Sequence, residues 1–188
     1  AHAVGKATHN GYTLYFKFLP KLPGLEEAVG RWTRNLIGFG APHVELFRLD
    51  DYPVLVSQEI KGLTLKETIQ KHPERLSQLD PKSLSQILFT TMLINPEDGK
   101  PDNYIVEQLS DNPPLYRLIG VDNDQALVPA VAKEQKKGWG KSLSVVQVKC
   151  ILYCLDQMDQ PIDPETREYF KNLDPRLLLS TWLNELDL

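Results

Sequence analysis

The sequence predicts an α+β fold in which a small sheet-rich lobe precedes a helical lobe that carries one late hairpin. Three observations favour this fold. Hydrophobic residues make up 41% and charged residues 24% of the 188 residues, close to globular averages, which excludes overall disorder. Strand-like segments with one helix fill residues 1–60, and helical spacing with cap signals fills most of the rest. A chain of this length forms one domain, since domains have ~100–200 residues.

Charge and composition disfavour several classes of function. The formal net charge is −4 and the isoelectric point is about 5.6, so a nucleic-acid partner is not expected. Apolar runs fall far short of the about 20 residues of a membrane span, and we expect a soluble protein without a transmembrane segment. Cys150 and Cys154 are four residues apart, which predicts a reduced pair on one helix face and a cytoplasmic location.

Residues 1–60 predict a sheet and one helix. Asn10-Gly11 is the strongest turn signal in the chain and predicts a hairpin over residues 3–19. Apolar residues then recur at helical spacing over residues 25–37, where Gly38 ends the helix. Two more strands are expected at residues 44–49 and 54–60.

The remaining segments are expected to be mainly helical. Thr64 and Glu67 form a capping box for a helix over residues 64–72, and Asp80-Pro81 starts the next helix. A polar loop over residues 96–103 precedes a hairpin with strands at 104–108 and 115–121. Beyond it we expect a basic loop at 130–142, a helix at 144–158, and two helices that begin after Asp163 and Asp174.

Three oxygen-bearing side chains and one lysine flank the predicted late hairpin. Asn103 directly precedes its first strand, Asp122 directly follows its second, and Asp98 with Lys100 lies just upstream. Because a hairpin brings its open ends together, these groups should meet at one mouth. Asp122 and Asn103 can hold Mg²⁺, a hard cation that takes oxygen ligands. Asp98 can accept a proton from an attacking hydroxyl, and Lys100 can neutralise a transferring phosphoryl group.

The order Asp98-x-Lys100-Pro101-x-Asn103 resembles the catalytic loop of Ser/Thr protein kinases. Asp122 stands where the metal-binding aspartate of the Asp-Phe-Gly motif belongs. The resemblance implies a protein-kinase-like bilobal fold, with ATP and Mg²⁺ as cofactors. Residues 1–188 would then form a single kinase-like domain with a small antiparallel-sheet N-lobe at 1–60 and a shortened helical C-lobe at 61–188.

The same resemblance assigns residues of the expected nucleotide site. Lys17 occupies the place of the lysine that binds ATP phosphates, and Glu26 or Glu27 on the next helix would be its partner, with Glu27 preferred. Gln58, Glu59 and Ile60 stand at the hinge that would contact the nucleotide.

The chain also departs from the common kinase pattern. Pro96-Glu97 replaces the usual His-Arg, and Asn123-Asp124 replaces Phe-Gly, so that Asp124 is either a second metal ligand or an N-cap. The run from Val121 to Pro129 is closer to type II phosphatidylinositol 4-kinases, which implies an atypical branch near the phosphoinositide kinases and the actin-fragmin kinase. The first strand and the Gly-rich loop of kinases have no counterpart in the sequence, so that either they lie upstream of it or the protein functions without them. Because the chain starts Ala1-His2-Ala3, without an initiator methionine, we interpret it as a fragment or a processed product.

A basic cluster follows the motif region. It is either a solvated loop or a site for an anionic acceptor, and it consists of Lys133, Lys136, Lys137 and Lys141 beside Trp139. The first hypothesis is an ATP- and Mg²⁺-dependent phosphotransferase to a hydroxyl, most simply an atypical serine/threonine protein kinase. The alternatives are a phosphoinositide or inositol phosphate kinase, and an inactive pseudokinase that acts as a binding module. The expected partners are ATP and a protein or phosphoinositide acceptor, with peripheral membrane contact for the lipid alternative.

Overall fold

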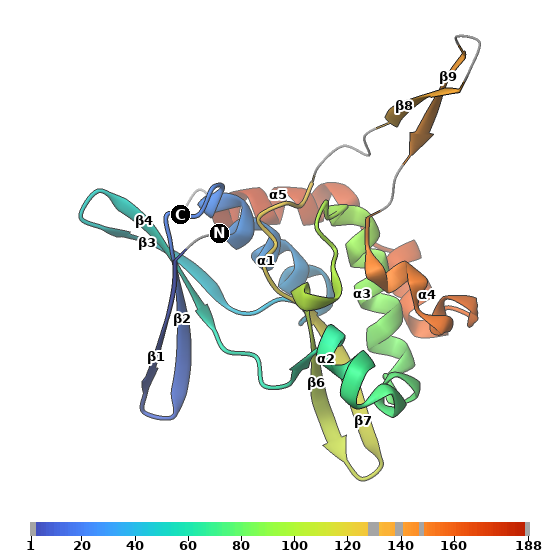
Figure 1. Ribbon diagram of the computed structural model, residues 1–188, viewed down its shortest axis with the longest axis horizontal. Helices are drawn as coiled ribbons and strands as arrows, with labels where there is room; N and C mark the ends of the chain where they lie inside the picture. The colour runs from blue at the N-terminus through green and yellow to red at the C-terminus, as the bar shows by residue number, and fades with distance from the viewer. Residues whose placement is uncertain (1–2, 128–131, 138–140, 147–148, 187–188) are drawn as a thin grey trace.

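The computed structural model describes residues 3–127 and 149–186, together with the backbone of 132–137 and 141–146. The N-terminal part is a four-stranded antiparallel sheet in the order β1-β2-β4-β3 (Figure 1). Its strands are β1 (Val4–His9), β2 (Tyr12–Phe18), β3 (Val44–Leu49) and β4 (Tyr52–Gln58). Both predicted strand pairs are confirmed, although β4 ends at Gln58 rather than at residue 60.

Helix α1 (Pro23–Ile37) connects β2 to β3 and lies beside the sheet (Figure 1). Its buried residues include Glu26, Val29, Thr33 and Leu36, which share one face because a helix repeats every 3.6 residues. Gly38 ends the helix in the left-handed conformation, with φ 78°, as the sequence predicts.

The C-terminal part is built around α3 (Pro81–Ile94). The side chain of Asp80 accepts a hydrogen bond from the Ser83 amide and so caps this helix. The other helices also begin at their predicted caps, and the expected Thr64–Glu67 capping box is present. They are α2 (Leu65–Lys71), α4 (Pro164–Lys171) and α5 (Pro175–Leu186), with a 3₁₀ helix η1 (Pro73–Gln78) between α2 and α3.

The predicted late hairpin is the centre of a second sheet. Strands β6 (Tyr104–Asp111) and β7 (Pro114–Gly120) pair antiparallel, and β5 (Leu63–Thr64) adds to the edge of β6. Val106 and Leu118 pair across the hairpin and are almost fully buried in the main core, together with residues of α2 and α3. The hairpin therefore has a rigid base, and its open ends are fixed in place.

The segment after residue 130 differs from the prediction. The expected basic loop at 130–142 and the first part of the expected helix at 144–158 form a separate antiparallel sheet, β8 (Ala132–Lys137) with β9 (Lys141–Val146). Two 3₁₀ helices follow, η3 (Ile151–Cys154) and η4 (Asp156–Asp159). The alternation Ser142-Leu-Ser-Val and the neighbouring valines favour a strand, which explains why the helical interpretation was wrong.

The two cysteines consequently have different surroundings. Cys150 is buried in the main core and precedes η3, whereas Cys154 at its end is exposed. The prediction that both lie on one helix face is wrong, because the segment is a single short 3₁₀ turn.

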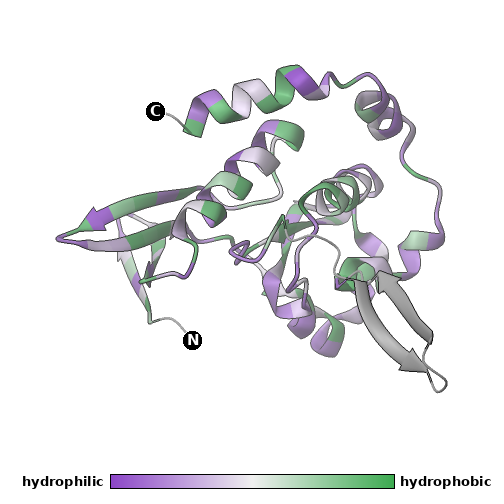
Figure 2. Cartoon of the chain, turned by 90° about the horizontal axis from the view of Figure 1, so that it is seen from above, coloured by the Kyte–Doolittle hydropathy of each residue, from purple (hydrophilic) through white to green (hydrophobic). Residues whose placement is uncertain are grey.

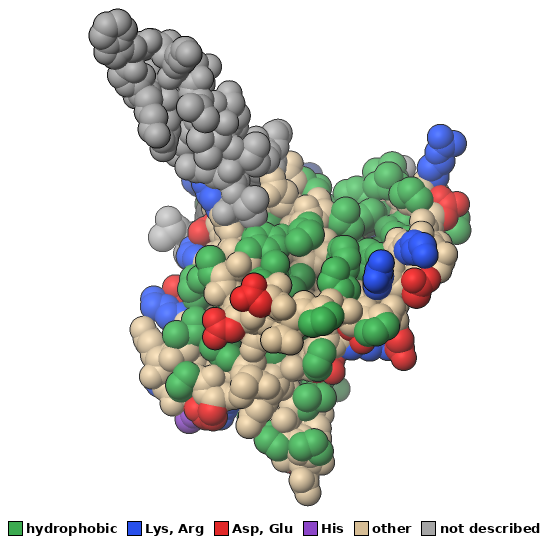
Figure 3. Space-filling view, turned by 90° about the vertical axis from the view of Figure 1, so that its right-hand side faces the viewer, with side chains coloured by type: hydrophobic (Ala, Val, Ile, Leu, Met, Phe, Trp, Pro, Cys, Tyr) green, Lys and Arg blue, Asp and Glu red, His purple; other side chains and the backbone are tan. Residues whose placement is uncertain are grey.

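The C-terminal helical part exposes hydrophobic side chains on the face that Figure 3 shows. Among the described residues, the helices are too short or too polar to span a bilayer.

Candidate active site

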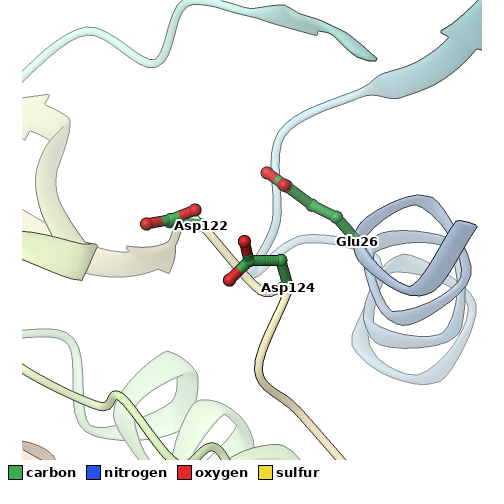
Figure 4. A group of neighbouring side chains, drawn as sticks. All are labelled: Glu26, Asp122 and Asp124. Atoms are coloured by element: carbon green, nitrogen blue, oxygen red, sulfur yellow. The ribbon is translucent and has the colours of Figure 1, made fainter. Parts of the chain in front are cut away.

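The amino group of Lys17 lies at the centre of a cluster of three carboxylates. Its Nζ is 2.9 Å from Glu26, 2.5 Å from Asp122 and 3.2 Å from Asp124. These side chains come from β2, from α1 and from the segment after β7, and Figure 4 shows the three carboxylates turned toward one another. We call these four residues the lysine cage. An ammonium group has three protons to donate, so the cage can occupy all of them.

Burial divides the three acids of the lysine cage. The side chains of Glu26 and Asp124 are each 8% exposed and that of Lys17 is 14% exposed, whereas Asp122 is 43% exposed. A buried carboxylate that lost Lys17 would keep its charge without a partner, which is costly. Asp122 can be solvated by water or bind a cation. Of the three carboxylates, it can therefore separate from Lys17 at the lowest cost in free energy.

The electrostatics of the lysine cage follow from this burial. Burial by itself lowers the pKa of Lys17, but its hydrogen bonds to Asp122 and Glu26 outweigh burial and raise the pKa above its ordinary value. Burial raises the pKa of Glu26, and the hydrogen bond from Lys17 offsets only part of this rise. Lys17 is therefore charged at neutral pH and neutralises the acids around it.

The preferred partner of Lys17 was wrongly predicted. Glu27 forms an ion pair with Arg31, one turn further along the helix, at 2.6 Å. Glu26 pairs with Lys17 because it lies on the buried face of α1 with Val29 and Thr33. The arginine four residues after Glu27 is the sequence signal that identifies Glu27 as the more exposed of the two acids.

The segment that carries Asp122 and Asp124 has an unusual backbone. Asp122 has φ 59°, in the left-handed region that residues other than glycine rarely adopt. Such a conformation persists only where the surrounding structure holds it, and it is frequent at functional positions. The N–H of Val121, directly before Asp122, donates to the carbonyl of Asn103 at 2.8 Å, which joins the two ends of the hairpin. The sequence leaves the role of Asp124 open, and the structure places its carboxylate against Lys17.

The predicted catalytic-loop residues lie at the same end of the hairpin. Asp98, Asn103 and Asp122 all line one small cavity. Lys100 forms an ion pair with Asp98 at 2.6 Å, and this hydrogen bond raises the pKa of Lys100. The Asn103 side-chain nitrogen donates to the backbone carbonyl of Asp98 at 2.8 Å. Because a carbonyl can only accept, this bond fixes the amide orientation and leaves the Asn103 oxygen as the atom that could ligate a metal ion.

A neighbouring strand-like segment holds the loop that contains Asp98 and Lys100 in place. The N–H of Gly99 donates to the carbonyl of Lys149 at 3.1 Å, and the N–H of Ile151 donates to the carbonyl of Gly99 at 2.8 Å. A Cβ atom at Gly99 would lie 2.7 Å from the Cys150 Cα, so no side chain fits there. Glycine between Asp98 and Lys100 is therefore a packing requirement.

A larger cavity of about 430 Å³ opens beside the lysine cage. Its lining includes Lys17, Glu26 and Asp122, and it also includes the predicted hinge residues Gln58 and Ile60. The third hinge residue, Glu59, directs its carboxylate to Lys6 at 2.8 Å and to the Tyr15 hydroxyl at 3.1 Å. An apolar groove of about 530 Å³ between α3 and residues 157–162 has no charged residue in its lining and is unsuited to phosphate.

The predicted acceptor residues are only partly described. Lys133, Lys136 and Lys137 lie on β8 and Lys141 begins β9, where Lys137 pairs with Lys141 across the sheet. The side chains of these lysines and all of Trp139 lie outside the described residues.

The residues at the hairpin mouth fit a magnesium ion. Asp122 supplies a carboxylate that is partly exposed, and Asn103, which lines the same small cavity, can supply an amide oxygen. Both are hard oxygen donors, and two protein ligands leave positions for water and phosphate, as magnesium sites require.

Comparison with known proteins gives structural similarity without sequence similarity. No family model matches the sequence, and no curated protein matches it either. A crystal structure of the proinflammatory kinase CtkA from Helicobacter pylori aligns with a TM-score of 0.50 and 14% sequence identity. The alignment covers 98% of this chain and 91% of that chain.

The chain has a kinase-like fold. The fold class predicted from the sequence is confirmed in this form, as an α+β architecture with antiparallel sheets that resembles a kinase structure. In the kinase-like fold of this chain, the lysine cage joins the N-terminal sheet and α1 to the segment after β7.

Proposed function

We propose that this chain is an ATP- and Mg²⁺-dependent phosphotransferase that acts on a hydroxyl acceptor, with serine or threonine of a protein as the acceptor. The observation that carries the proposal is the contact of Lys17 with both Glu26 and Asp122, which lie 9 and 105 residues away in sequence. In this contact the Lys17 ammonium group lies beside the Asp122 carboxylate, the proposed metal ligand, at the cavity of about 430 Å³. The structural similarity to a kinase supports the same reaction.

Each residue of the site has a role in this proposal. Lys17 would bind phosphate oxygens, and Glu26 would hold the ammonium group in position. Asp122 and Asn103 would hold Mg²⁺, which supplies neutralising charge for the phosphates. Gln58 and Ile60 line the side of the cavity near β4 and would contact the nucleoside part of ATP.

Asp98 and Lys100 would act on the acceptor. The Asp98 carboxylate lies at the rim and can accept a proton from an incoming hydroxyl group. Lys100 now neutralises Asp98, and the same ammonium group can turn to the phosphoryl group as negative charge develops on it. Both side chains are more than a third exposed, so they can change partners at small cost.

A nucleotide-binding module without turnover is the second candidate. The observation that favours it is the full occupation of Lys17 by three carboxylates, together with Asp124 in place of the glycine of the Asp-Phe-Gly motif. Such a module would bind ATP and lack transfer.

Two measurements test the proposal. Calorimetry with ATP, with and without Mg²⁺, should show metal-dependent binding, and its absence would reject both candidates. Transfer of labelled phosphate to a panel of proteins, and to vesicles that contain phosphoinositides, should then show protein labelling. Binding without transfer favours the module, and labelling of vesicles alone favours the lipid alternative.

The basic cluster provides a further test of the acceptor. Reversing charge at Lys136 and Lys137 together should weaken acceptor use and leave ATP affinity unchanged, and the effect should decline as salt is raised. Unchanged acceptor kinetics would remove the basic cluster from the site.

A further inference from the structure

Helix α5 contacts α1, the helix that carries Glu26, through one stripe of residues. Leu178, Trp182 and Glu185 are the half-buried positions of α5, and they recur at spacings of four and three residues. This is the spacing of one helix face. The two helices lie side by side in both ribbon views (Figures 1 and 2), although more than a hundred residues separate them in sequence.

Trp182 makes the most specific contacts of this stripe. Its indole N–H donates to the backbone carbonyl of Ala28 at 2.8 Å. Its ring also meets the ring of Trp32 edge-to-face, with centroids 5.2 Å apart. Edge-to-face aromatic pairs and hydrogen bonds to a backbone carbonyl both depend on orientation. Trp182 therefore constrains how α1 is rotated about its axis and where it lies along that axis.

Glu185 adds a second point of attachment one turn along α5. Its backbone carbonyl accepts from Arg31 at 3.2 Å, and its carboxylate accepts from Asn35 at 2.5 Å. Arg31 and Asn35 lie one turn apart on α1, so α5 holds α1 at two levels. Ala28, the attachment point nearer the start of α1, is two residues from Glu26. Both residues lie within one helical turn, so a constraint on the backbone of Ala28 also constrains that of Glu26.

The contact between the helices is also weak enough to be released. No residue of α5 is buried over its described length. A groove of about 300 Å³ remains at this contact, lined by Val29, Trp32, Leu178 and Trp182 among others. The attachment of α5 thus depends on a few directional contacts and little closed core.

We propose that α5 positions α1 for nucleotide binding, and that Trp182 is the residue through which it holds Glu26 against Lys17. This inference rests on the proposed function, because it concerns regulation of the same site. Trp182 is a positioning residue, since it touches neither Lys17 nor the cavity beside the lysine cage. Detachment of α5 would loosen Glu26 while leaving Asp98, Asn103 and Asp122 in place.

Hydrogen exchange tests the mechanical part without any nucleotide. In Trp182→Ala, the amides of residues 23–37 should exchange ~5-fold faster or more, because a hydrogen bond and an aromatic pair are lost. Trp182→Phe keeps an aromatic ring, so its amide exchange rates should lie between those of Trp182→Ala and the wild type. Leu177→Ala is the matched control, since Leu177 is on α5 and 64% exposed. Equal exchange in Trp182→Ala and Leu177→Ala would overturn the proposal.

A double-mutant cycle tests whether Trp182 acts through Glu26. Trp182→Ala should weaken Mg·ATP binding ~5-fold in the wild-type background and less than ~2-fold in the Glu26→Gln background, because the target of the positioning is then already lost. Equal effects in both backgrounds would show a general loss of stability and contradict the proposal. If the wild-type chain binds no Mg·ATP, the proposed function fails, and the exchange rates still decide whether α5 holds α1.

Discussion

The site contains two lysine–carboxylate groups, and Asp122 of the first group lines both the larger and the smaller cavity. The lysine cage is largely buried, and its lysine bonds to three carboxylates from separate elements. The Lys100–Asp98 pair is half-exposed, and only Gly99 separates its two residues in sequence. The first group connects separate parts of the fold, whereas both residues of the second lie in one loop.

The difference determines what a substitution can reveal at each place. Loss of a partner in a buried ion pair costs about 3–5 kcal/mol, whereas an exposed pair contributes about 0–1 kcal/mol. A change at a buried member of the lysine cage should therefore alter both stability and binding. A change in the exposed pair should alter the chemistry alone, which makes it the cleaner test of mechanism.

Lys17→Met should give the largest effect. Glu26, Asp122 and Asp124 have ligand atoms within 4.8 Å of one another, and without Lys17 their charges repel in a site that is mostly buried. We expect loss of Mg·ATP binding and a free energy of unfolding lower by about 3 kcal/mol or more at neutral pH. Lys6→Met, in an exposed ion pair on the same sheet, is the control, and its free energy of unfolding should stay close to that of the wild type.

The pH dependence of Lys17→Met distinguishes charge repulsion from a packing defect. Burial raises the pKa of Glu26 already in the intact protein, where Lys17 counteracts the rise. In the variant Glu26 should take up a proton at higher pH than before. The destabilisation should thus be present above that pKa and diminish as pH falls through it. Urea denaturation of both proteins from pH 8 to pH 4 measures this, and a constant difference would indicate packing.

Asp122→Ala should remove Mg²⁺-dependent nucleotide binding and leave the fold intact. Asp122 is the exposed member of the lysine cage, and Lys17 retains Glu26 and Asp124 as partners after the change. Calorimetry should show the same weak ATP binding with and without Mg²⁺. A variant whose affinity still rises with Mg²⁺ would exclude Asp122 as the metal ligand.

Asp98→Asn should lower turnover by ~10²-fold or more while ATP affinity stays nearly unchanged, as expected for a lost general base. Because Asp98 is a partly exposed loop residue, the free energy of unfolding should change by less than about 0.5 kcal/mol. Phosphate transfer rates and calorimetry on the same preparation check both statements. A variant that keeps most of the wild-type rate would remove Asp98 from the mechanism.

Glu26→Gln and Glu27→Gln form a matched pair on one helix. The first weakens a charge-assisted hydrogen bond to Lys17 and should reduce Mg·ATP affinity ~10-fold, whereas the second affects only the pair with Arg31. We expect Glu27→Gln to bind Mg·ATP as the wild type does. Equal affinities of the two variants would contradict the assignment of Glu26.

The elements with strong local sequence signals are predictable from the sequence. Asn10-Gly11 sets the first hairpin, Asp80-Pro81 starts α3, and the late hairpin brings Asn103 and Asp122 together because any hairpin joins its own ends. These signals act within a few residues, so tertiary packing did not have to be known.

The predictions that failed, and the one that stayed open, depend on contacts between distant segments. The choice between Glu26 and Glu27 depends on how α1 is rotated against the sheet, and the role of Asp124 depends on its approach to Lys17 across 107 residues. The segment after residue 141 has apolar residues that suit a helix or a strand. Extended structure forms in this segment because β9 pairs with β8 and Cys150 pairs with Gly99.

The contrast between buried and exposed groups also applies to the two thiols, where we expect the smallest effect. Burial raises the pKa of Cys150, and its sulfur lies 3.2 Å from the Tyr104 hydroxyl inside the core. The thiolate is the reactive form, so Cys150 should resist a maleimide at pH 7, whereas the exposed Cys154 should react in the native protein. Mass spectrometry should find one label, and Cys154→Ser should remove it without changing Mg·ATP affinity. Rapid labelling of Cys150 would show that the segment supporting Gly99 opens, and the catalytic loop would then lack the rigid support that the Asp98 assignment requires.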